Sequence, residues 1–429
     1  MSGEVAPRPN WLKWAPFLRS PPALSGRQWQ IMGLVVVASI FDRYDLAILQ
    51  MALPQIQSGL GITDAQLGGM VASIRLGALP AFLLMLASDW LGRRRLLIFT
   101  VLAYTLFTGA TAFATTPQTF VILQFCARIF ITAEVLLAAV IITEEFPQAA
   151  RGWGIGALVA LSGYGFALAA LLFAFIDLIP FGWRALYLVA LVPLLLVARL
   201  RRNLPETERF EELSEQHKQR SWRMALKPAL SLATAYPGRM MALGVVVMIV
   251  SFATQAAFFY DPAYLQEAHN WQPFQISLLF IGAGAIALFG SAFAGALGDR
   301  IGRKRATVLF LLIMPFVIAA FYNGFGLLLP ILWAAMIFAQ VGAGVSLETV
   351  GNELFPTSYR ATASGARSVL ANIGAVLGLS AHTLLSVQVG SRWTAIAFLA
   401  PLILIAPIVV ALTFPETSDR ALEEIAPER

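Results

Sequence analysis

The sequence predicts an all-α membrane protein with twelve transmembrane helices in two pseudo-symmetric six-helix halves. Three observations predict this fold. Of the 429 residues, 58% are hydrophobic and only 13% are charged, which is far from the balance of a soluble domain. Apolar stretches of roughly 20 residues, the length that crosses a bilayer as a helix, recur along the chain. Short sequence patterns also repeat between the first and second halves.

Twelve apolar stretches are long enough to form spanning helices. They cover residues 29–53, 65–87, 95–115, 118–144, 153–177, 183–200, 238–264, 273–297, 305–325, 328–352, 362–386 and 393–414. The strands of a membrane barrel would instead give short segments of alternating hydrophobicity. We therefore expect a multi-pass helical protein in the lipid bilayer.

Lys and Arg residues gather on one set of connections. They are frequent before the first stretch and between stretches 2 and 3, 6 and 7, and 8 and 9, whereas the opposite connections hold few beyond Arg184 and Arg392. The positive-inside rule then places both termini in the cytoplasm. Short loops favour a bacterial inner membrane. The formal net charge of +6 follows from this topology, so we expect no nucleic-acid partner.

Three patterns occur twice, in the same order. The pairs are "SDWLGRRR" at 88–95 and "GDRIGRKR" at 298–305, "EEFPQAAR" at 144–151 and "NELFPTSYR" at 352–360, and "LPETER" at 204–209 and "FPETSDR" at 414–420. The offsets are 210, 209 and 210 residues, which indicates an internal duplication. The predicted organisation is a cytoplasmic tail (1–28), an N-terminal half (29–202), a cytoplasmic linker (203–237), a C-terminal half (238–414) and a cytoplasmic tail (415–429).

Two parallel six-span halves with D-x-x-G-R-[RK]-[RK] loops resemble the major facilitator superfamily of secondary transporters. The resemblance covers nearly the whole chain, although Met85 stands where the first loop pattern usually has Gly. It implies the major facilitator fold, alternating access and a monomer. The E-x-x-P-x-x-x-R and PET patterns look like those of the sugar porters and of related aromatic-acid and organic-ion transporters.

The repeated patterns supply candidates for conformational control. Acids and arginines at cytoplasmic helix ends can make contacts that exist in one conformation only, and such contacts bias the inward or outward state. Their alternative role is topology and packing alone. These candidate gating residues are Asp89, Arg93, Glu144, Arg151, Asp299, Arg303, Glu353 and Arg360, together with Glu348 and Arg367 as a second cytoplasmic gate.

The sequence FDRYD at 41–45 puts three charges inside the first apolar stretch, where isolated charges cost several kcal/mol. Asp42 and Asp45 are three residues apart and share a helix face, whereas Arg43 points about 100° away from Asp42. Two carboxylates at low dielectric repel, which favours holding a proton on one of them. An arginine offers a planar fork that suits a carboxylate.

Further charges lie inside stretches 2 and 4, and together with FDRYD they could neutralise one another as static salt bridges or serve transport. As proton-coupling candidates we take Asp42, Asp45 and Glu134. As substrate-binding candidates we take Arg43, Arg75, Arg128, Tyr164 and Gln255.

Two branches of the superfamily share features with these stretches. Asp-x-x-Asp in span 1 resembles the aromatic-acid/proton symporters, with Arg43 in place of the usual Gly. An Asp-Arg pair in span 1 with Arg and Glu in span 4 resembles the anion/cation symporters, with Asp45 where Asn is frequent. The resemblance implies symport of a small organic anion, such as an aromatic carboxylate. The expected coupling ion is H⁺ in preference to Na⁺, with no cofactor and no bound metal.

Other transporter classes fit less well. A sugar or neutral-metabolite proton symporter needs many neutral hydrogen bonds, and span 7 offers only Gln255. A drug/proton antiporter usually has a Gly-Pro motif in span 5, which is missing here. A non-transporting nutrient receptor on the same scaffold stays open. The sequence holds no P-loop, no His/Cys metal pattern and no G-x-S-x-G elbow, so we expect no enzyme.

Overall fold

The protein is helical throughout the part that the structure describes. This computed structural model describes residues 9, 18, 22–189, 191, 231–356, 359–418 and 425, and their side chains except those of 85–91, 93, 94, 288 and 361. Most of the predicted linker and of both predicted tails lies outside the described residues.

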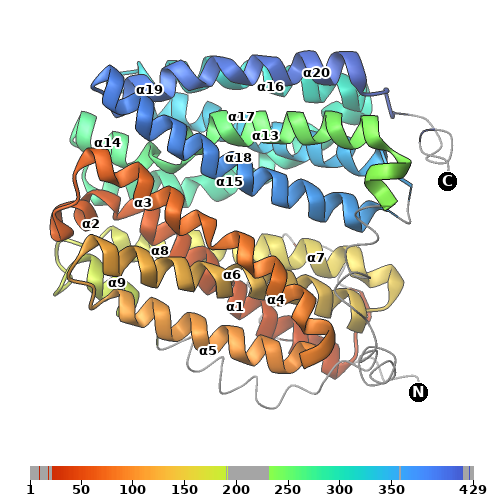
Figure 1. The fold of residues 1–429 in the computed structure, drawn as a ribbon, viewed down its shortest axis with the longest axis horizontal. Coiled ribbons are helices and arrows are strands. Elements are labelled where there is room, and N and C mark those ends of the chain that lie inside the picture. Colours follow the sequence, from red (N-terminus) through yellow and green to blue (C-terminus); the bar gives the residue numbers. More distant parts are fainter. Residues whose placement is uncertain are drawn as a thin grey trace. The chain divides into compact units, whose positions relative to one another are not determined.

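Two series of helices follow one another along the chain (Figure 1). The first comprises α1 (Gly26–Met51), α2 (Leu53–Leu60), α3 (Asp64–Leu76), α4 (Ala78–Leu91), α5 (Arg93–Thr111), α6 (Pro117–Glu145), α7 (Gln148–Ser162), α8 (Tyr164–Phe173) and α9 (Trp183–Val189). The second comprises α13 (Pro237–Phe259), α14 (Asp261–His269), α15 (Pro273–Ile301), α16 (Arg303–Tyr322), α17 (Leu328–Glu353), α18 (Arg360–Val389), α19 (Arg392–Leu399), η3 (Ala400–Leu404) and α20 (Ile405–Thr413).

These helices confirm the predicted all-α membrane fold. Nine helical stretches of the described residues are long and apolar enough to cross a membrane. The remaining predicted spans fall on α1, α5 and α9. α1 is long enough to cross a membrane but contains the charged sequence FDRYD. α5 is apolar over Arg95–Thr111. The predicted sixth span extends past the end of α9, where residue 191 alone is described.

The structure corrects the predicted boundaries of two spans. Span 5 is made of α7 and α8, which meet at Gly163. Span 7 was predicted to reach residue 264, but α13 ends at Phe259. The backbone of Tyr260 leaves the helical region at φ −96° and ψ 2°, and α14 starts with Asp261 and Pro262. A proline is well tolerated in a first helical turn and poorly tolerated inside a helix, so the chain restarts there.

The described residues form two compact units. Unit 1 holds those up to Gly61 and those from Gly77 to 191, and unit 2 holds Ile62–Leu76 and those from 231 onward. Unit 2 therefore includes α3, which packs along α18. The half boundaries predicted from the repeat stay a prediction.

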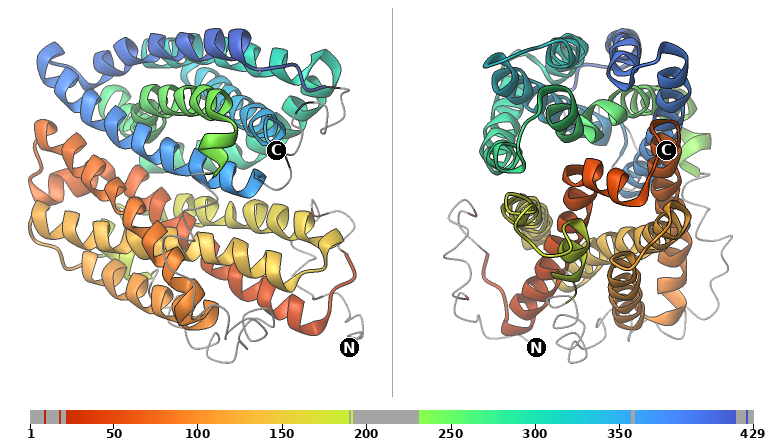
Figure 2. Two further views of the ribbon diagram at one scale, coloured as in Figure 1. Left: turned by 45° about the vertical axis from the view of Figure 1, so that its right-hand side comes forward. Right: turned by 90° about the vertical axis from the view of Figure 1, so that its left-hand side faces the viewer.

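The same helix crossing occurs in each unit. In unit 1, α8 packs on α1 so closely that a Cβ on Gly165 would overlap the carbonyl oxygen of Ile40. In unit 2, α18 packs on α13, and a Cβ on Gly378 would overlap the carbonyl oxygen of Phe252. Figures 1 and 2 show α13 and α18 side by side. Glycine lets two helix backbones approach within membranes, so the duplication seen in the sequence extends to packing.

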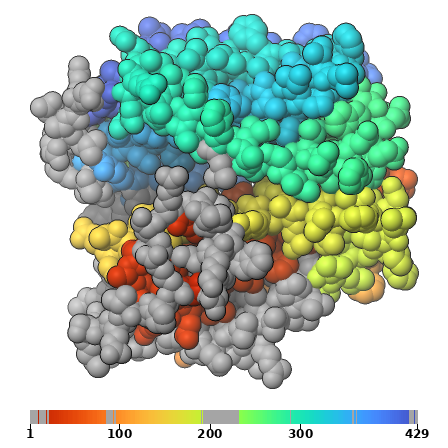
Figure 3. All heavy atoms as spheres, turned by 180° about the vertical axis from the view of Figure 1, so that it is seen from behind, coloured from red at the N-terminus to blue at the C-terminus, as the bar shows by residue number. Residues whose placement is uncertain are grey.

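Large apolar side chains cover the outside of the spanning helices. On α15, which contributes to the teal face in Figure 3, the exposed side chains include Phe274, Leu278, Ile281, Phe289 and Phe293. Such a surface would be unfavourable in water and is ordinary in hydrocarbon. The cores of the units are apolar as well, so buried charges stand out against them.

Candidate functional site

The FDRYD sequence lies at the crossing of α1 and α8 in unit 1. A Cβ on Gly165 would come within 2.7 Å of the Arg43 Cβ and 2.8 Å of the Tyr44 backbone nitrogen. The small residue on α8 thus brings a second helix directly against the charged turn of α1. Asp42 and Asp45 of this turn are buried, and burial strengthens electrostatic interactions.

Three acids of unit 1 are almost completely buried. Asp42 is 3% exposed, Asp45 is 4% exposed and Glu134 on α6 is fully buried. All three are the proton-coupling residues predicted from the sequence. Burying a carboxylate is costly unless a positive charge or several hydrogen bonds compensate.

Arg128 on α6 supplies the positive charge for this group. It interacts electrostatically with both aspartates, most strongly with Asp45, and with Arg43 as a like charge. Asp45 in turn has Arg128 as its charged partner. Within the described part of the chain, Asp45 Oδ1 and Arg128 Nε have no hydrogen-bond partner and the two side chains form no ion pair within 4.0 Å. The attraction therefore acts across a gap, and each group keeps hydrogen-bonding capacity.

Three tyrosines surround this charge pair, and the sequence analysis missed them as functional residues. The Tyr44 hydroxyl donates to the Leu186 carbonyl at 2.9 Å, and the Tyr104 hydroxyl donates to the Phe41 carbonyl at 3.2 Å. Both bonds join α1 to other helices of unit 1.

Tyr187 on α9 differs from the other two tyrosines. It is fully buried, interacts electrostatically with Asp45 and, within the described residues, has a hydroxyl without a hydrogen-bond partner. A tyrosine inside an apolar stretch is the one sequence signal that could have pointed to it, because a buried hydroxyl normally requires a partner.

The other predicted substrate residues are dispersed. Arg43 is exposed on α1 and interacts with Asp42. Tyr164 is 41% exposed at the start of α8. Arg75 on α3 and Gln255 on α13 are half-buried in unit 2. Each unit therefore carries part of the predicted set, with the charge cluster in unit 1.

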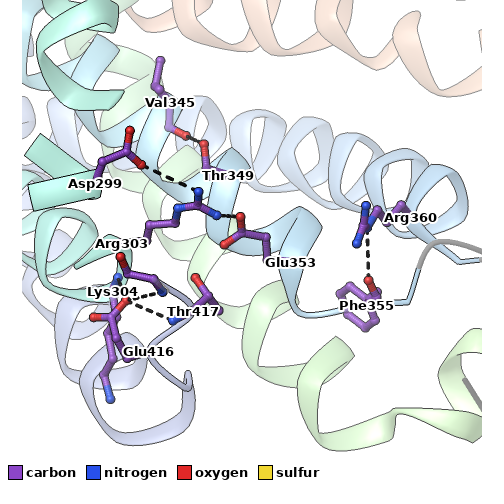
Figure 4. Close-up of polar contacts among 11 residues, drawn as sticks. Asp299, Arg303, Lys304, Val345, Thr349, Glu353, Phe355, Arg360, Glu416 and Thr417 are labelled. Atoms are coloured by element: carbon purple, nitrogen blue, oxygen red, sulfur yellow. Dashed lines mark hydrogen bonds and ion pairs between the residues drawn. The ribbon is translucent and has the colours of Figure 1, made fainter. Parts of the chain in front are cut away.

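Three of the predicted gating residues of unit 2 form a connected group (Figure 4). Arg303, at the start of α16, contacts Asp299 on α15 at 3.7 Å and makes an ion pair with Glu353 at the end of α17. One arginine thus ties three helices together. Of the equivalent residues in the first half, the side chains of Asp89 and Arg93 lie outside the described residues.

Glu416, from the PET pattern, joins this group beside Gly302. Its Oε1 accepts hydrogen bonds from the backbone nitrogens of Lys304, Thr417 and Ser418 at 3.2, 3.0 and 3.2 Å. Partial burial opposes its ionisation, yet these backbone bonds hold the pKa of Glu416 below its ordinary value. A helix N-terminus is a natural place for a carboxylate.

Two hydrogen bonds repeat between the units at the ends of the fourth spans. Arg151 Nε donates to the Phe146 carbonyl at 3.2 Å, and Arg360 Nε donates to the Phe355 carbonyl at 3.3 Å. These arginines, predicted as gating residues, fold back onto the carboxyl ends of α6 and α17. Figure 4 shows the second of them.

The first helix of each unit also reaches the end of its fourth span. Gln28 Nε2 donates to the Glu145 carbonyl at 2.8 Å, and Arg239 donates to the Leu354 carbonyl at 2.7 Å. Glu145 also pairs with Arg27 at 3.0 Å, while its neighbour Glu144, the predicted residue, is half-buried. The sequence pattern located the turn, but the structure identifies Glu145 as the partner of Arg27.

The second predicted gate is an ion pair. Arg367 on α18 donates to Glu348 on α17 at 2.9 Å. Glu348 is 55% exposed and Arg367 is 22% exposed. An exposed ion pair contributes little to stability, so this pair can break and form at low cost.

Comparisons with known proteins fit this arrangement. The family model described as the Major Facilitator Superfamily matches residues 35–267 and again residues 243–428. The putative niacin/nicotinamide transporter NiaP of Bacillus subtilis (strain 168) is 29% identical over 359 residues, which cover 82% of this chain and 87% of the relative. The benzoate transport protein of Acinetobacter baylyi (strain ATCC 33305 / BD413 / ADP1) is 25% identical over 416 residues, covering 88% and 87%.

The fold itself has solved counterparts. The crystal structure of a D-xylose-proton symporter matches with a TM-score of 0.76, covering 92% of this chain and 99% of that chain at 17% sequence identity. At this identity the likeness shows the fold alone.

Proposed function

This chain belongs to the major facilitator superfamily, and we propose that it moves a small organic anion across the membrane together with a proton. Membership makes it a multi-pass membrane transporter and not an enzyme. The observation that carries the proposal is the electrostatic attraction in unit 1 between the buried acid Asp45 and Arg128. The two side chains attract each other without forming an ion pair.

Coupling follows from this relationship. While Asp45 is ionised, its negative charge partly compensates the positive charge of Arg128. When a proton binds the Asp45 carboxylate, that attraction disappears and the positive charge of Arg128 loses its strongest compensating partner. A substrate carboxylate restores the balance by accepting two parallel N–H bonds from the guanidinium. Proton binding and anion binding therefore favour each other, which is the thermodynamic requirement of symport.

Asp42 and Glu134 have supporting roles in the proposal. Both are buried and within electrostatic reach of the same tyrosine, Tyr104. Asp42 also interacts with Arg43. These acids offset the positive charge of the two arginines, so that a single added proton and a single added anion keep the cluster close to neutral.

The relatives support the substrate class. Benzoate is a carboxylate, and the protein named for it matches along most of this chain. A cis,cis-muconate transport protein of the same organism is 23% identical over 367 residues. A relative named for niacin and nicotinamide favours a second candidate, a pyridine or other neutral ring compound, because nicotinamide carries no carboxylate.

We place the transporter in a bacterial inner membrane with both termini in the cytoplasm, because Lys and Arg gather on the connections of that side. H⁺ is the proposed coupling ion and the monomer the proposed working form. Transport would proceed by alternating access, in which protonation and substrate binding select between inward-open and outward-open states.

The test is uptake into proteoliposomes that contain the purified full-length chain. Labelled benzoate, nicotinate, nicotinamide and xylose are supplied with an acidic exterior, a neutral exterior, or an imposed sodium gradient. We expect accumulation of a carboxylate only with the acidic exterior, and its loss with a protonophore.

Weak acids also cross bilayers as neutral molecules, so protein-free liposomes and liposomes with Arg128→Ala give the background. Ser39→Ala is the matched control, because Ser39 is also buried on α1 and has no role in the proposal. Uptake that ignores the proton gradient, or that prefers xylose, contradicts the proposed function.

A further inference from the structure

Asp261 is a buried acid of unit 2 that the charge cluster around Asp45 does not involve. It is 2% exposed and occupies the first turn of α14, directly after the spanning helix α13 ends at Phe259. It is not among the candidate residues taken from the sequence, although it lies inside the predicted stretch 238–264. Its burial requires a physical explanation.

The side chain has one strong partner. Trp333 Nε1 on α17 donates a hydrogen bond of 2.7 Å to Asp261 Oδ2. Trp333 is fully buried and packs against Phe280 of α15, with ring centroids 5.2 Å apart. The indole can only donate, so this bond persists whether Asp261 is protonated or not. It fastens the start of α14 to α17.

Cations do not compensate the Asp261 charge. Over the residues that the structure describes, it forms no ion pair within 4.0 Å. Two nearby hydroxyls are engaged elsewhere, since Tyr264 donates to the Tyr322 carbonyl at 3.0 Å and Tyr322 donates to the Ala257 carbonyl. An ionised carboxylate here would be a nearly uncompensated buried charge, which costs several kcal/mol.

The charged and titratable groups on α14 and its neighbours contact one another or aromatic rings. Arg392 on α19 pairs with Glu267 and, at 3.3 Å, with Asp64 of α3. His382 of α18 contacts the Arg392 carbonyl at 3.0 Å and stacks against Tyr260. His269 stacks against Tyr264.

The tyrosine Tyr322 of α16 interacts electrostatically with Asp261, and also with Tyr260 and Tyr264. Tyrosines with hydroxyls in such surroundings stay neutral across the physiological range. Among the residues that the structure describes, no basic group pairs with Asp261, so a proton is the cation that fits.

We propose that Asp261 is a proton-binding site of unit 2, held beside α17 in both protonation states by the hydrogen bond from Trp333. This site is separate from Asp45, and its existence does not depend on the proposed symport. Two effects compete at it. Burial favours the neutral acid, whereas the Trp333 hydrogen bond and the first turn of α14 favour the carboxylate.

Burial outweighs the other effects and raises the pKa of Asp261 to about 7. Because the folded-state pKa lies above the unfolded value of 3.8, the stabilisation from Asp261 is complete below that unfolded value. It is lost as the pH rises through about 7. Above this pH the ionised carboxylate keeps the Trp333 hydrogen bond and draws in water, so the hydration of this end of unit 2 follows the pH of the solution that reaches it.

Infrared difference spectroscopy of the full-length protein in lipid nanodiscs tests the site directly. The carbonyl stretch of a protonated carboxyl group is followed from pH 5 to pH 9. We expect a band that titrates with a midpoint near 7 and is missing in Asp261→Asn. Asp45→Asn should keep that band, which separates the two sites. Asp177→Asn, at an exposed acid, is the matched control and should leave the band unchanged.

A second variant keeps the proposal open to contradiction if Asp261→Asn folds poorly. Trp333→Phe keeps an aromatic ring and removes the donor, so the midpoint of the Asp261 band should move to higher pH by about one unit. A midpoint below 5 in the unmodified protein overturns the proposal. So does a band near 7 that persists in Asp261→Asn, or a midpoint that Trp333→Phe leaves in place.

Discussion

The carboxylate of Glu416 lies where a Cβ on Gly302 would stand. Gly302 has φ +101° and precedes α16, and Glu416 accepts the backbone N–H bonds beside it. The glycine of the D-x-x-G-R pattern and the acid of the PET pattern therefore depend on each other structurally. The glycine provides the space and the backbone angle, and the acid satisfies the helix end that the turn exposes.

Gly302→Ala should destabilise unit 2. The new Cβ displaces the Glu416 carboxylate. In addition, alanine must adopt the positive φ of this position, which residues with a side chain disfavour, at a cost of about 1–3 kcal/mol from the backbone alone. The thermal unfolding midpoint of the purified protein in detergent should fall clearly. Gly326→Ala is the matched control, because Gly326 also has positive φ but has open space around it. Equal midpoints for the two variants would contradict the described contact.

Glu416 should make unfolding depend on acidity. Its folded-state pKa is lowered from 4.5, so the stability it contributes is present above that unfolded value and is lost as the pH falls through the folded value. Glu416→Gln should therefore lower the unfolding midpoint at pH 7 and flatten its decline below about pH 5. The exposed acid variant Asp177→Asn should keep the wild-type slope. A Glu416→Gln profile parallel to wild type would exclude this role.

Gly165→Ala should reduce transport by displacing the charged residues of the site, and not only lower the stability of the fold. An added methyl group overlaps the Ile40 carbonyl and pushes α8 away from the FDRYD turn, which moves Asp45 relative to Arg128. We expect an initial uptake rate at least tenfold lower at an expression level close to wild type. Gly156→Ala on α7 has open space around its Cβ and should transport normally. Unchanged uptake by Gly165→Ala would mean that the helix crossing does not position the charge pair.

Arg128→Lys should separate carboxylates from neutral analogues. Lysine keeps the charge and loses the two-pronged geometry, so the KM for a carboxylate in counterflow should rise about tenfold or more. The KM for a neutral amide, where one is transported, should change little. Arg184→Lys, whose guanidinium bonds the Ala114 carbonyl, is the control. Equal effects on acid and amide would remove Arg128 from carboxylate recognition.

Much of the fold could be predicted because it depends on local properties. Apolar length located the spans, and the repeated motifs indicated two halves. The crossing glycines could not be singled out in this way, since Gly165 and Gly378 are two among 33 glycines. The end of α13 also escaped prediction, because Phe259 to Tyr264 is an apolar sequence interrupted only by Asp261 and Pro262.

The site could be predicted only in part. The charged residues of FDRYD and Arg128 were conspicuous, because charges are rare in apolar stretches. Which aspartate has Arg128 as its main partner depends on helix rotation, and the structure gives Asp45. Tyr104 and Tyr187 approach this pair from α5 and α9, so only packing reveals them. Contacts between residues far apart in sequence, such as Glu416 with Gly302, likewise have no local signal.

The central claim is that the Asp45 carboxylate carries the coupled proton. The most direct measurement is the pH change outside proteoliposomes while substrate enters, with counterflow exchange recorded on the same preparation. In Asp45→Asn, which resembles the protonated acid, substrate-dependent proton uptake should vanish and counterflow should persist, whereas Ser39→Ala should show both. Proton uptake in Asp45→Asn that still accompanies substrate at the wild-type ratio would contradict the account.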